Sequence, residues 1–245
     1  MKTLLFISLF ITSLFCVAEN TSLQSFSSAK KKLEREIYLV EQERLTLYCK
    51  AAFDDNKNIT PPLGFESPKH KKRSTRVEWE HVVPAENFGR NFNEWRAGHE
   101  QCVNSKGKAY KGRRCAEKIN LEYRYMQADM YNIYPAIGSV NAGRSNYNFV
   151  MLGNMENSFG SCEFKIANKK AEPPEPSRGM IARAYLYMDS TYANYSMSRQ
   201  QRQLMNAWHN SHPVEPWECE RTERIKAIQG NENKVVQESC QAAGF

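Results

Sequence analysis

Apolar residues recur at helical spacing in several stretches of the chain. In the first stretch, Leu33, Ile37 and Val40 share one face of a predicted helix over residues 27–43, and lysine and glutamate occupy the other face. Further helices are predicted over residues 87–100, 116–131, 181–188 and 219–229, and one more after Ser198. Gly230 directly follows residues 219–229 and is typical of a helix C-terminus.

Alternation of apolar and polar side chains predicts a strand over residues 76–83, which ends at Pro84. A shorter strand is predicted over residues 46–49. Loops are predicted over residues 54–73, 138–161 and 172–177, which are rich in proline, glycine, asparagine or serine. Short strands are expected inside the second of these loops, and the third is expected to be exposed. The chain shows no internal repeat and no linker, and its length suits one domain with a sizeable core.

The N-terminus has the pattern of a secretory signal peptide. Lys2 precedes an apolar run over residues 4–15, and Cys16-Val17-Ala18 forms a small-x-small cleavage site. The apolar run is short for a membrane span, and no later stretch is as hydrophobic. A lipoprotein anchor at Cys16 is the weaker alternative, because bulky Phe15 precedes it. We therefore expect cleavage after Ala18 and a mature domain over residues 19–245.

The cysteine count agrees with export. After signal cleavage an even number of cysteines remains, at Cys49, Cys102, Cys115, Cys162, Cys219 and Cys240. An even number in an oxidising compartment predicts disulfides. None of these cysteines forms a C-x-x-C pair, which argues against a zinc ribbon or a redox motif. The cysteine spacings do not by themselves choose the connectivity.

The chain is basic, with a formal net charge of +7 and an isoelectric point near 9.0. Basic exported proteins often bind polyanions such as nucleic acid, although basicity also serves solubility alone. Two segments concentrate the charge: residues 69–73, and the loop between Cys102 and Cys115. A run of charge is most often a solvated surface, and contact with a phosphate backbone is the second interpretation.

The pair Glu80-His81 stands near the end of the predicted strand, directly before Val82-Val83. Hydrolysis of a phosphodiester needs a base for water and positive charge for the phosphorus and the leaving oxygen. Histidine suits the first task because it titrates near neutral pH, and magnesium with oxygen ligands suits the others. Glu80 can supply one such oxygen. Spacing alone, however, favours a structural pair over a catalytic one.

Two residues near the end of the helix predicted over residues 116–131 are candidate metal ligands. Asn132 offers a neutral carbonyl oxygen, and Asp129 offers a carboxylate. Asn132 is also a good helix cap, and spacing alone favours that role. Asp129 could equally be a buried structural partner.

Arg113 and Arg114 lie at the end of the basic loop, just before Cys115. An arginine makes paired hydrogen bonds to phosphate, so either could hold the scissile or a neighbouring phosphate. The alternative is a pair of solvated loop arginines.

Five stretches carry a resemblance to a known family. They are RVEWEHVVPA at residues 76–85, ADMYN at 128–132, PAIG through RSN at 135–146, RGMIAR at 178–183, and WECER through IQGN at 217–231. Over most of the mature chain, the sequence resembles the bacterial endonuclease I family of periplasmic and secreted nucleases.

The resemblance implies an α+β fold of one disulfide-stapled domain around a ββα-metal, or His-metal finger, core. It implies that His81 is the general base, and that Glu80 and Asn132 bind one Mg²⁺, which Mn²⁺ or Ca²⁺ can replace. It also implies a phosphate-binding arginine. Arg113 is the better match because it follows Gly112, but the loop is longer than the family's usual form and Arg114 stays an alternative.

For the cysteines, the resemblance implies the pairs Cys49–Cys240, Cys102–Cys115 and Cys162–Cys219. For activity, it implies a monomeric, periplasmic or secreted endonuclease that does not bind membranes. Such an enzyme contacts the phosphate backbone of DNA and RNA, has little sequence specificity and leaves 5′-phosphate ends.

Two other classes are compatible with the composition. A basic protein that binds nucleic acid without cutting it would show binding that persists in magnesium. A disulfide-rich structural protein would show no metal-dependent effect on nucleic acid. The presence of Glu80, His81 and Asn132 together argues against both.

Overall fold

The computed structural model describes residues 19–245, and the predicted signal peptide lies outside them. The helices are α1 (Phe26–Lys32), α2 (Ala85–Gly89), α3 (Asn93–Arg96), α4 (Arg113–Ile119), α5 (Leu121–Ala128), α6 (Gly138–Arg144), α7 (Arg178–Thr191), α8 (Arg199–Ser211), α9 (Pro216–Gln229) and α10 (Lys234–Ala243). Shorter helical turns are η1 (Leu33–Ile37), η2 (Glu41–Glu43), η3 (Lys71–Arg73), η4 (Met130–Asn132) and η5 (Glu175–Ser177). The strands are β1 (Ala52–Phe53), β2 (Ile59–Thr60), β3 (Val77–His81), β4 (Ile133–Ile137), β5 (Asn148–Phe149), β6 (Lys165–Ala167) and β7 (Lys170–Glu172).

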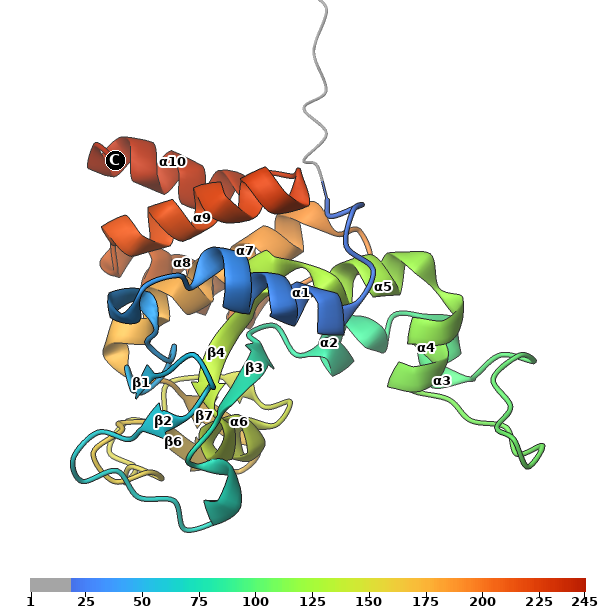
Figure 1. Cartoon of the computed structure of the whole chain (residues 1–245), viewed down its shortest axis with the longest axis horizontal. Coiled ribbons are helices and arrows are strands. Elements are labelled where there is room, and N and C mark those ends of the chain that lie inside the picture. The colour runs from blue at the N-terminus through green and yellow to red at the C-terminus, as the bar shows by residue number, and fades with distance from the viewer. Residues whose placement is uncertain (1–18) are drawn as a thin grey trace, which may run out of the picture.

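The antiparallel pair β3–β4 lies at the centre of the molecule (Figure 1). Val77 is opposite Ile137 and His81 is opposite Ile133, so segments distant in the sequence meet along their whole length. Helix α6 follows β4 without a loop and packs against both strands. The result is a strand–strand–helix unit in which the second strand leads directly into the helix.

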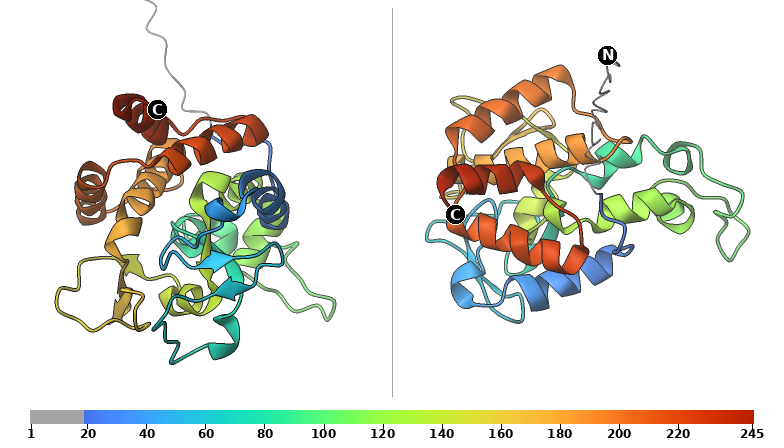
Figure 2. Two further views of the ribbon diagram at one scale, coloured as in Figure 1. Left: turned by 60° about the vertical axis from the view of Figure 1, so that its left-hand side comes forward. Right: turned by 90° about the horizontal axis from the view of Figure 1, so that it is seen from above.

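Helices α7 to α10 gather on one side of this unit, and the small sheets β1–β2 and β5–β7–β6 lie on the other (Figures 1 and 2). Buried apolar side chains from Ala29 to Ile225 form one continuous cluster. Burial of this apolar surface is the main favourable contribution to folding. The described residues therefore form a single α+β domain. None of their helices is long and apolar enough to cross a membrane.

Several predicted elements are confirmed. Strand β3 lies inside residues 76–83, α7 includes residues 181–188, and α9 ends at Gly230, which has a positive φ of 85°. The hydroxyl of Ser198 accepts a hydrogen bond from the Gln201 amide and caps α8. These elements were predictable because local signals mark them, such as the serine cap of α8 and the glycine after α9.

The prediction of a loop over the start of residues 138–161 was wrong, because residues 138–144 form α6. Glycine and asparagine lower the helix propensity of this segment, which hid the helix. Packing explains the glycine at the first position. A Cβ on Gly138 would lie 2.6 Å from the Arg73 carbonyl oxygen and 2.9 Å from Glu78 Oε1. Tertiary packing against β3 thus requires a residue that local propensity disfavours.

Other predicted elements differ in extent. The helix predicted over residues 116–131 is divided into α4 and α5 at Asn120, whose side chain caps α5. The predicted strand over residues 46–49 is a turn. The proline-rich segment 172–177 is mostly buried rather than exposed, with Glu172 accepting a hydrogen bond from Arg178.

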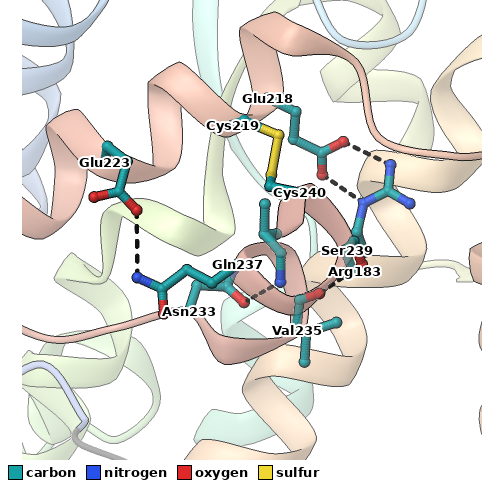
Figure 3. The surroundings of a disulfide bond; sticks show 10 residues. Arg183, Glu218, Cys219, Glu223, Asn233, Val235, Gln237, Ser239 and Cys240 are labelled. Carbon is teal, nitrogen blue, oxygen red and sulfur yellow. Dashed lines mark hydrogen bonds and ion pairs between the residues drawn. A yellow bond between two sulfur atoms is a disulfide. The ribbon is translucent and has the colours of Figure 1, made fainter. Parts of the chain in front are cut away.

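The disulfide pairing corrects two of the three predicted bonds. Cys49 pairs with Cys162 and Cys219 pairs with Cys240, whereas Cys102–Cys115 is confirmed. The reason is the path of the C-terminus, where α10 returns beside α9 and brings Cys240 to a Cα–Cα distance of 5.9 Å from Cys219. Figure 3 shows this bond, with a hydrogen bond from Gln237 to Glu223 joining the same two helices.

Loss of the Cys49–Cys162 bond is expected to destabilise the protein more than loss of the Cys102–Cys115 bond. The two bonds span 113 and 13 residues. In the chain-entropy description they contribute about 4–5 and about 3 kcal/mol. Denaturant unfolding of the paired cysteine-to-alanine variants measures the difference, and mass analysis of the oxidised, digested protein tests the connectivity. A Cys49–Cys240 peptide would contradict the pairing.

Candidate active site

A cleft of about 680 Å³ lies beside β3 and is bordered by α1, α4 and α6. Its lining includes Phe26, Glu80, His81, Arg113, Asn141 and Arg144. These residues come from segments far apart in the chain. The cleft therefore exists only because tertiary packing brings α1, α4 and α6 beside β3.

Glu80 is a carboxylate held almost entirely out of water, at 3% exposure. Its Oε1 accepts hydrogen bonds from the Tyr48 hydroxyl at 2.9 Å and from Arg144 Nη1 at 2.7 Å. Within residues 19–245, Oε2 accepts no hydrogen bond. Burial raises the pKa of Glu80 to about 7, and the positive charge of Arg144 opposes that shift. One carboxylate oxygen is thus anchored, and the other is available to a cation in the cleft.

His81 is the last residue of β3, and its ring packs on Phe26 with the centroids 4.4 Å apart. Nε2 lies 2.8 Å from the Gln127 carbonyl oxygen. A carbonyl oxygen only accepts hydrogen bonds, so Nε2 donates its proton and Nδ1 holds the lone pair of the neutral ring. Burial, together with the charge of Arg113, lowers the pKa of His81 to about 3. The side chain is therefore a neutral proton acceptor at physiological pH.

The structure distinguishes the two candidate arginines. Arg113 is the first residue of α4, lines the cleft and lies over the Phe26 ring at 5.2 Å. Its Nη2 is 3.5 Å from Gln127 Oε1. Arg114 is exposed, stacks on Tyr110 and does not line the cleft. Only Arg113 is placed to reach a phosphate beside His81.

Asn132 lies outside the cleft and is fully buried. Its Oδ1 accepts a hydrogen bond from the Val83 amide at 2.7 Å, and its Nδ2 donates to the Val83 carbonyl at 3.0 Å. The side chain thus holds the chain just beyond His81. This position does not fit the predicted role as a metal ligand, because both ends of the amide already bind the backbone.

Asn141, which the sequence reasoning missed, is an asparagine that does line the cleft. It lies on α6 and lines the cleft together with Glu80. Its Nδ2 donates to Glu78 Oε2 at 3.2 Å, and Glu78 is itself held by Arg73 and Arg76. Within the described chain, Oδ1 of Asn141 accepts no hydrogen bond. The only sequence signal for this residue was its position inside the matching stretch 135–146.

Asp129, the other predicted candidate, is a structural residue. Its carboxylate is fully buried and accepts hydrogen bonds from Tyr187, Tyr192 and Gln229. Burial raises its pKa, although these hydrogen bonds favour the ionised form. The network joins α5 to α7 and α9, away from the cleft.

Magnesium typically keeps several waters and takes one or two protein oxygens. Glu80 Oε2 and Asn141 Oδ1 are hard oxygen donors without another partner within residues 19–245, and both side chains line the same cleft. Among residues 19–245, no group of three or more histidine, cysteine, aspartate or glutamate side chains is placed to hold a metal. The donor set thus fits a hydrated hard cation rather than a zinc ion enclosed by protein ligands.

A model of the endonuclease I family matches residues 20–240. This match covers most of the chain, and the protein therefore belongs to the endonuclease I family. Membership makes it a nuclease, and so a hydrolase.

Three relatives illustrate the similarity. An extracellular deoxyribonuclease of Aeromonas hydrophila is 37% identical over 225 residues, which cover 89% of this chain and 91% of the relative. A periplasmic deoxyribonuclease of the same organism is 36% identical, with 89% and 87% covered. Endonuclease-1 of Buchnera aphidicola (strain APS) is 39% identical, with 78% and 72% covered. The first two names agree with the compartment predicted from the sequence.

Proposed function

We propose that the protein is a secreted or periplasmic, magnesium-dependent endonuclease. It hydrolyses phosphodiester bonds of DNA, and also of RNA, with little sequence specificity and leaves 5′-phosphate ends. The observation that carries the proposal is that His81, a neutral base, lines one cleft with the buried carboxylate of Glu80 and the guanidinium of Arg113. The names of the relatives support DNA as a substrate.

Glu80 and Asn141 would hold the magnesium ion. The β3–β4–α6 unit supports a ββα-metal site, because it presents an acidic residue from a strand and an amide from the following helix. When bound, magnesium would stabilise negative charge at phosphorus and on the departing 3′ oxygen. Arg144 keeps the Glu80 carboxylate in place, and Glu78 orients the amide of Asn141.

His81 would take a proton from the attacking water through Nδ1, while Nε2 stays bound to the Gln127 carbonyl. Arg113 would hold the phosphate. Burial and then the positive charge of Arg113 lower the pKa of His81, and a phosphate next to Arg113 counters the second of these causes. Substrate binding is therefore expected to strengthen the base.

The proposed enzyme is a monomer, and its cleft is lined by cationic side chains such as Lys30 and Arg113. Its cationic groups suit phosphates, and phosphate contacts carry no sequence information. Recognition through the backbone accounts for the proposed tolerance of different sequences.

Incubation of the oxidised protein with plasmid DNA and with RNA, with and without EDTA, tests the proposal. Cleavage in magnesium that EDTA abolishes is expected, with product ends that DNA ligase accepts as 5′-phosphates. Binding without cleavage in magnesium would instead indicate a non-catalytic nucleic-acid-binding protein.

Arg113→Ala is expected to lower kcat by about 10²-fold or more, because a positioned donor to the transition-state charge is lost. Arg114→Ala should change kcat and KM only a few-fold, since its side chain points to Tyr110 outside the cleft. Steady-state cleavage of a duplex oligonucleotide measures both. Equal losses in the two variants would contradict the assignment of the phosphate contact to Arg113.

A further inference from the structure

We propose that residues 102–115 form an arm that binds the phosphate backbone of duplex DNA beyond the cleaved bond, through Lys106, Lys108 and Lys111. The proposal rests on the proposed function, because it extends along the substrate the contact assigned to Arg113.

The arm projects from the body of the protein, next to α3 and α4 (Figures 1 and 2). The Cys102–Cys115 disulfide closes its base. Above the base, the Tyr110 amide donates to the Cys102 carbonyl at 2.8 Å, and Val103 bridges Ala109. The arm is therefore a stapled hairpin rather than a free loop.

The tip of the arm has a defined turn. Asn104 Oδ1 accepts hydrogen bonds from the amides of Lys106 and Lys108, at 2.9 and 3.0 Å. Gly107 has a φ of 75°, a conformation that glycine adopts readily, and its amide donates to the Asn104 carbonyl. The two lysines are thus presented by a preorganised backbone, which lowers the entropic cost of binding.

The charge of the arm is of one sign. Residues 102–115 contain three lysines and two arginines and no acidic residue. Lys106, Lys108 and Lys111 are exposed, and none of them forms an ion pair within residues 19–245. Some basic residues elsewhere in the protein, such as Arg183, are instead paired with a carboxylate. The arm therefore concentrates uncompensated positive charge away from the body.

The arm contributes little to the hydrophobic core. Val103 is 41% exposed, and Tyr110 contacts Arg114 rather than the core cluster. A surface without apolar anchors is poorly suited to a protein partner. Lysines on a polar hairpin suit a polyanion, because the electrostatic attraction between them does not require a complementary pocket.

The arm is continuous with the cleft. Near the end of the arm, Gly112 donates its amide to the Trp95 carbonyl at 3.1 Å, and Arg113 follows as the first residue of α4. The phosphate backbone of a DNA that reaches Arg113 in the cleft therefore passes the base of the arm. Duplex DNA is the partner that extends far enough, as a stiff polyanion, to touch the cleft and the arm together.

The test compares two matched double variants. K106Q/K108Q removes two charges from the arm, and K169Q/K170Q removes two exposed charges from the turn and start of β7. Binding to a duplex that spans cleft and arm is measured by fluorescence anisotropy in EDTA over a range of salt. The slope of log affinity against log salt should fall by about two in the arm variant only. The loss of DNA affinity in the arm variant, relative to the parent, should then shrink roughly tenfold between about 50 and 200 mM salt.

Cleavage in magnesium supplies the second readout. The arm variant K106Q/K108Q should show a higher KM for the long duplex and an unchanged kcat. The variant K106R/K108R keeps the charges and should behave like the parent. A salt slope equal to that of K169Q/K170Q would overturn the arm proposal even if the parent cleaves DNA. Absence of cleavage by the parent would overturn the proposed function, while the binding slopes would still decide the role of the arm.

Discussion

His81→Ala is expected to reduce cleavage by about 10²–10⁴-fold, the usual contribution of a positioned general base. Binding of DNA should stay close to that of the parent, since the phosphate contact comes from Arg113. The substitution leaves the Gln127 carbonyl without its partner, which costs about 1–3 kcal/mol of stability. Single-turnover cleavage, anisotropy binding and thermal unfolding together separate these effects.

His99→Ala is the matched control, because His99 is exposed and lies outside the cleft. It should retain parental activity. A His81→Ala protein that is folded and fully active would remove His81 from the mechanism, whereas loss of DNA binding in step with cleavage would point to a binding role instead.

Asn141→Ala and Asn132→Ala are expected to change different properties, magnesium binding in the first variant and stability in the second. Asn141→Ala should weaken magnesium binding by about 10–100-fold or more, because it removes the amide oxygen that faces the cleft. Its stability should change little, since Asn141 is only half-buried. Titration of cleavage with magnesium, and calorimetric titration of the protein without DNA, measure the change.

Asn132→Ala should instead destabilise the fold. It leaves the amide and the carbonyl of Val83 buried without partners, at about 1–3 kcal/mol each. Folded Asn132→Ala protein should bind magnesium with parental affinity. Weakened magnesium binding in a fully stable Asn132→Ala variant would return the ligand role to Asn132 and contradict the assignment to Asn141.

The local parts of the site were predictable from the sequence. The alternation over residues 76–83 predicted β3, and with it the position of Glu80 and His81 at the end of a strand. The end signal Gly230 predicted the end of α9. Such signals act within one element, because a few neighbouring residues carry them.

The proposed metal ligand, Asn141, was not predictable in this way. Helix α6 has low intrinsic helix propensity and forms because it packs on β3, with Gly138 allowing the close approach to Arg73 and Glu78. Asn132 has the sequence context of a ligand, but its amide is used to hold Val83. Which of two asparagines reaches the cleft depends on the packing of α6.

The sequence by itself determined the even set of cysteines, the basic arm and the Glu80-His81 strand end, because each is a property of composition or of one short segment. Only the tertiary structure decided that Cys49 bonds to Cys162, that Arg113 rather than Arg114 enters the cleft, and that Asn141 lines the same cleft as Glu80. Each of these depends on the path of segments far apart in the chain, and that path is set by burial of the shared core rather than by local pattern.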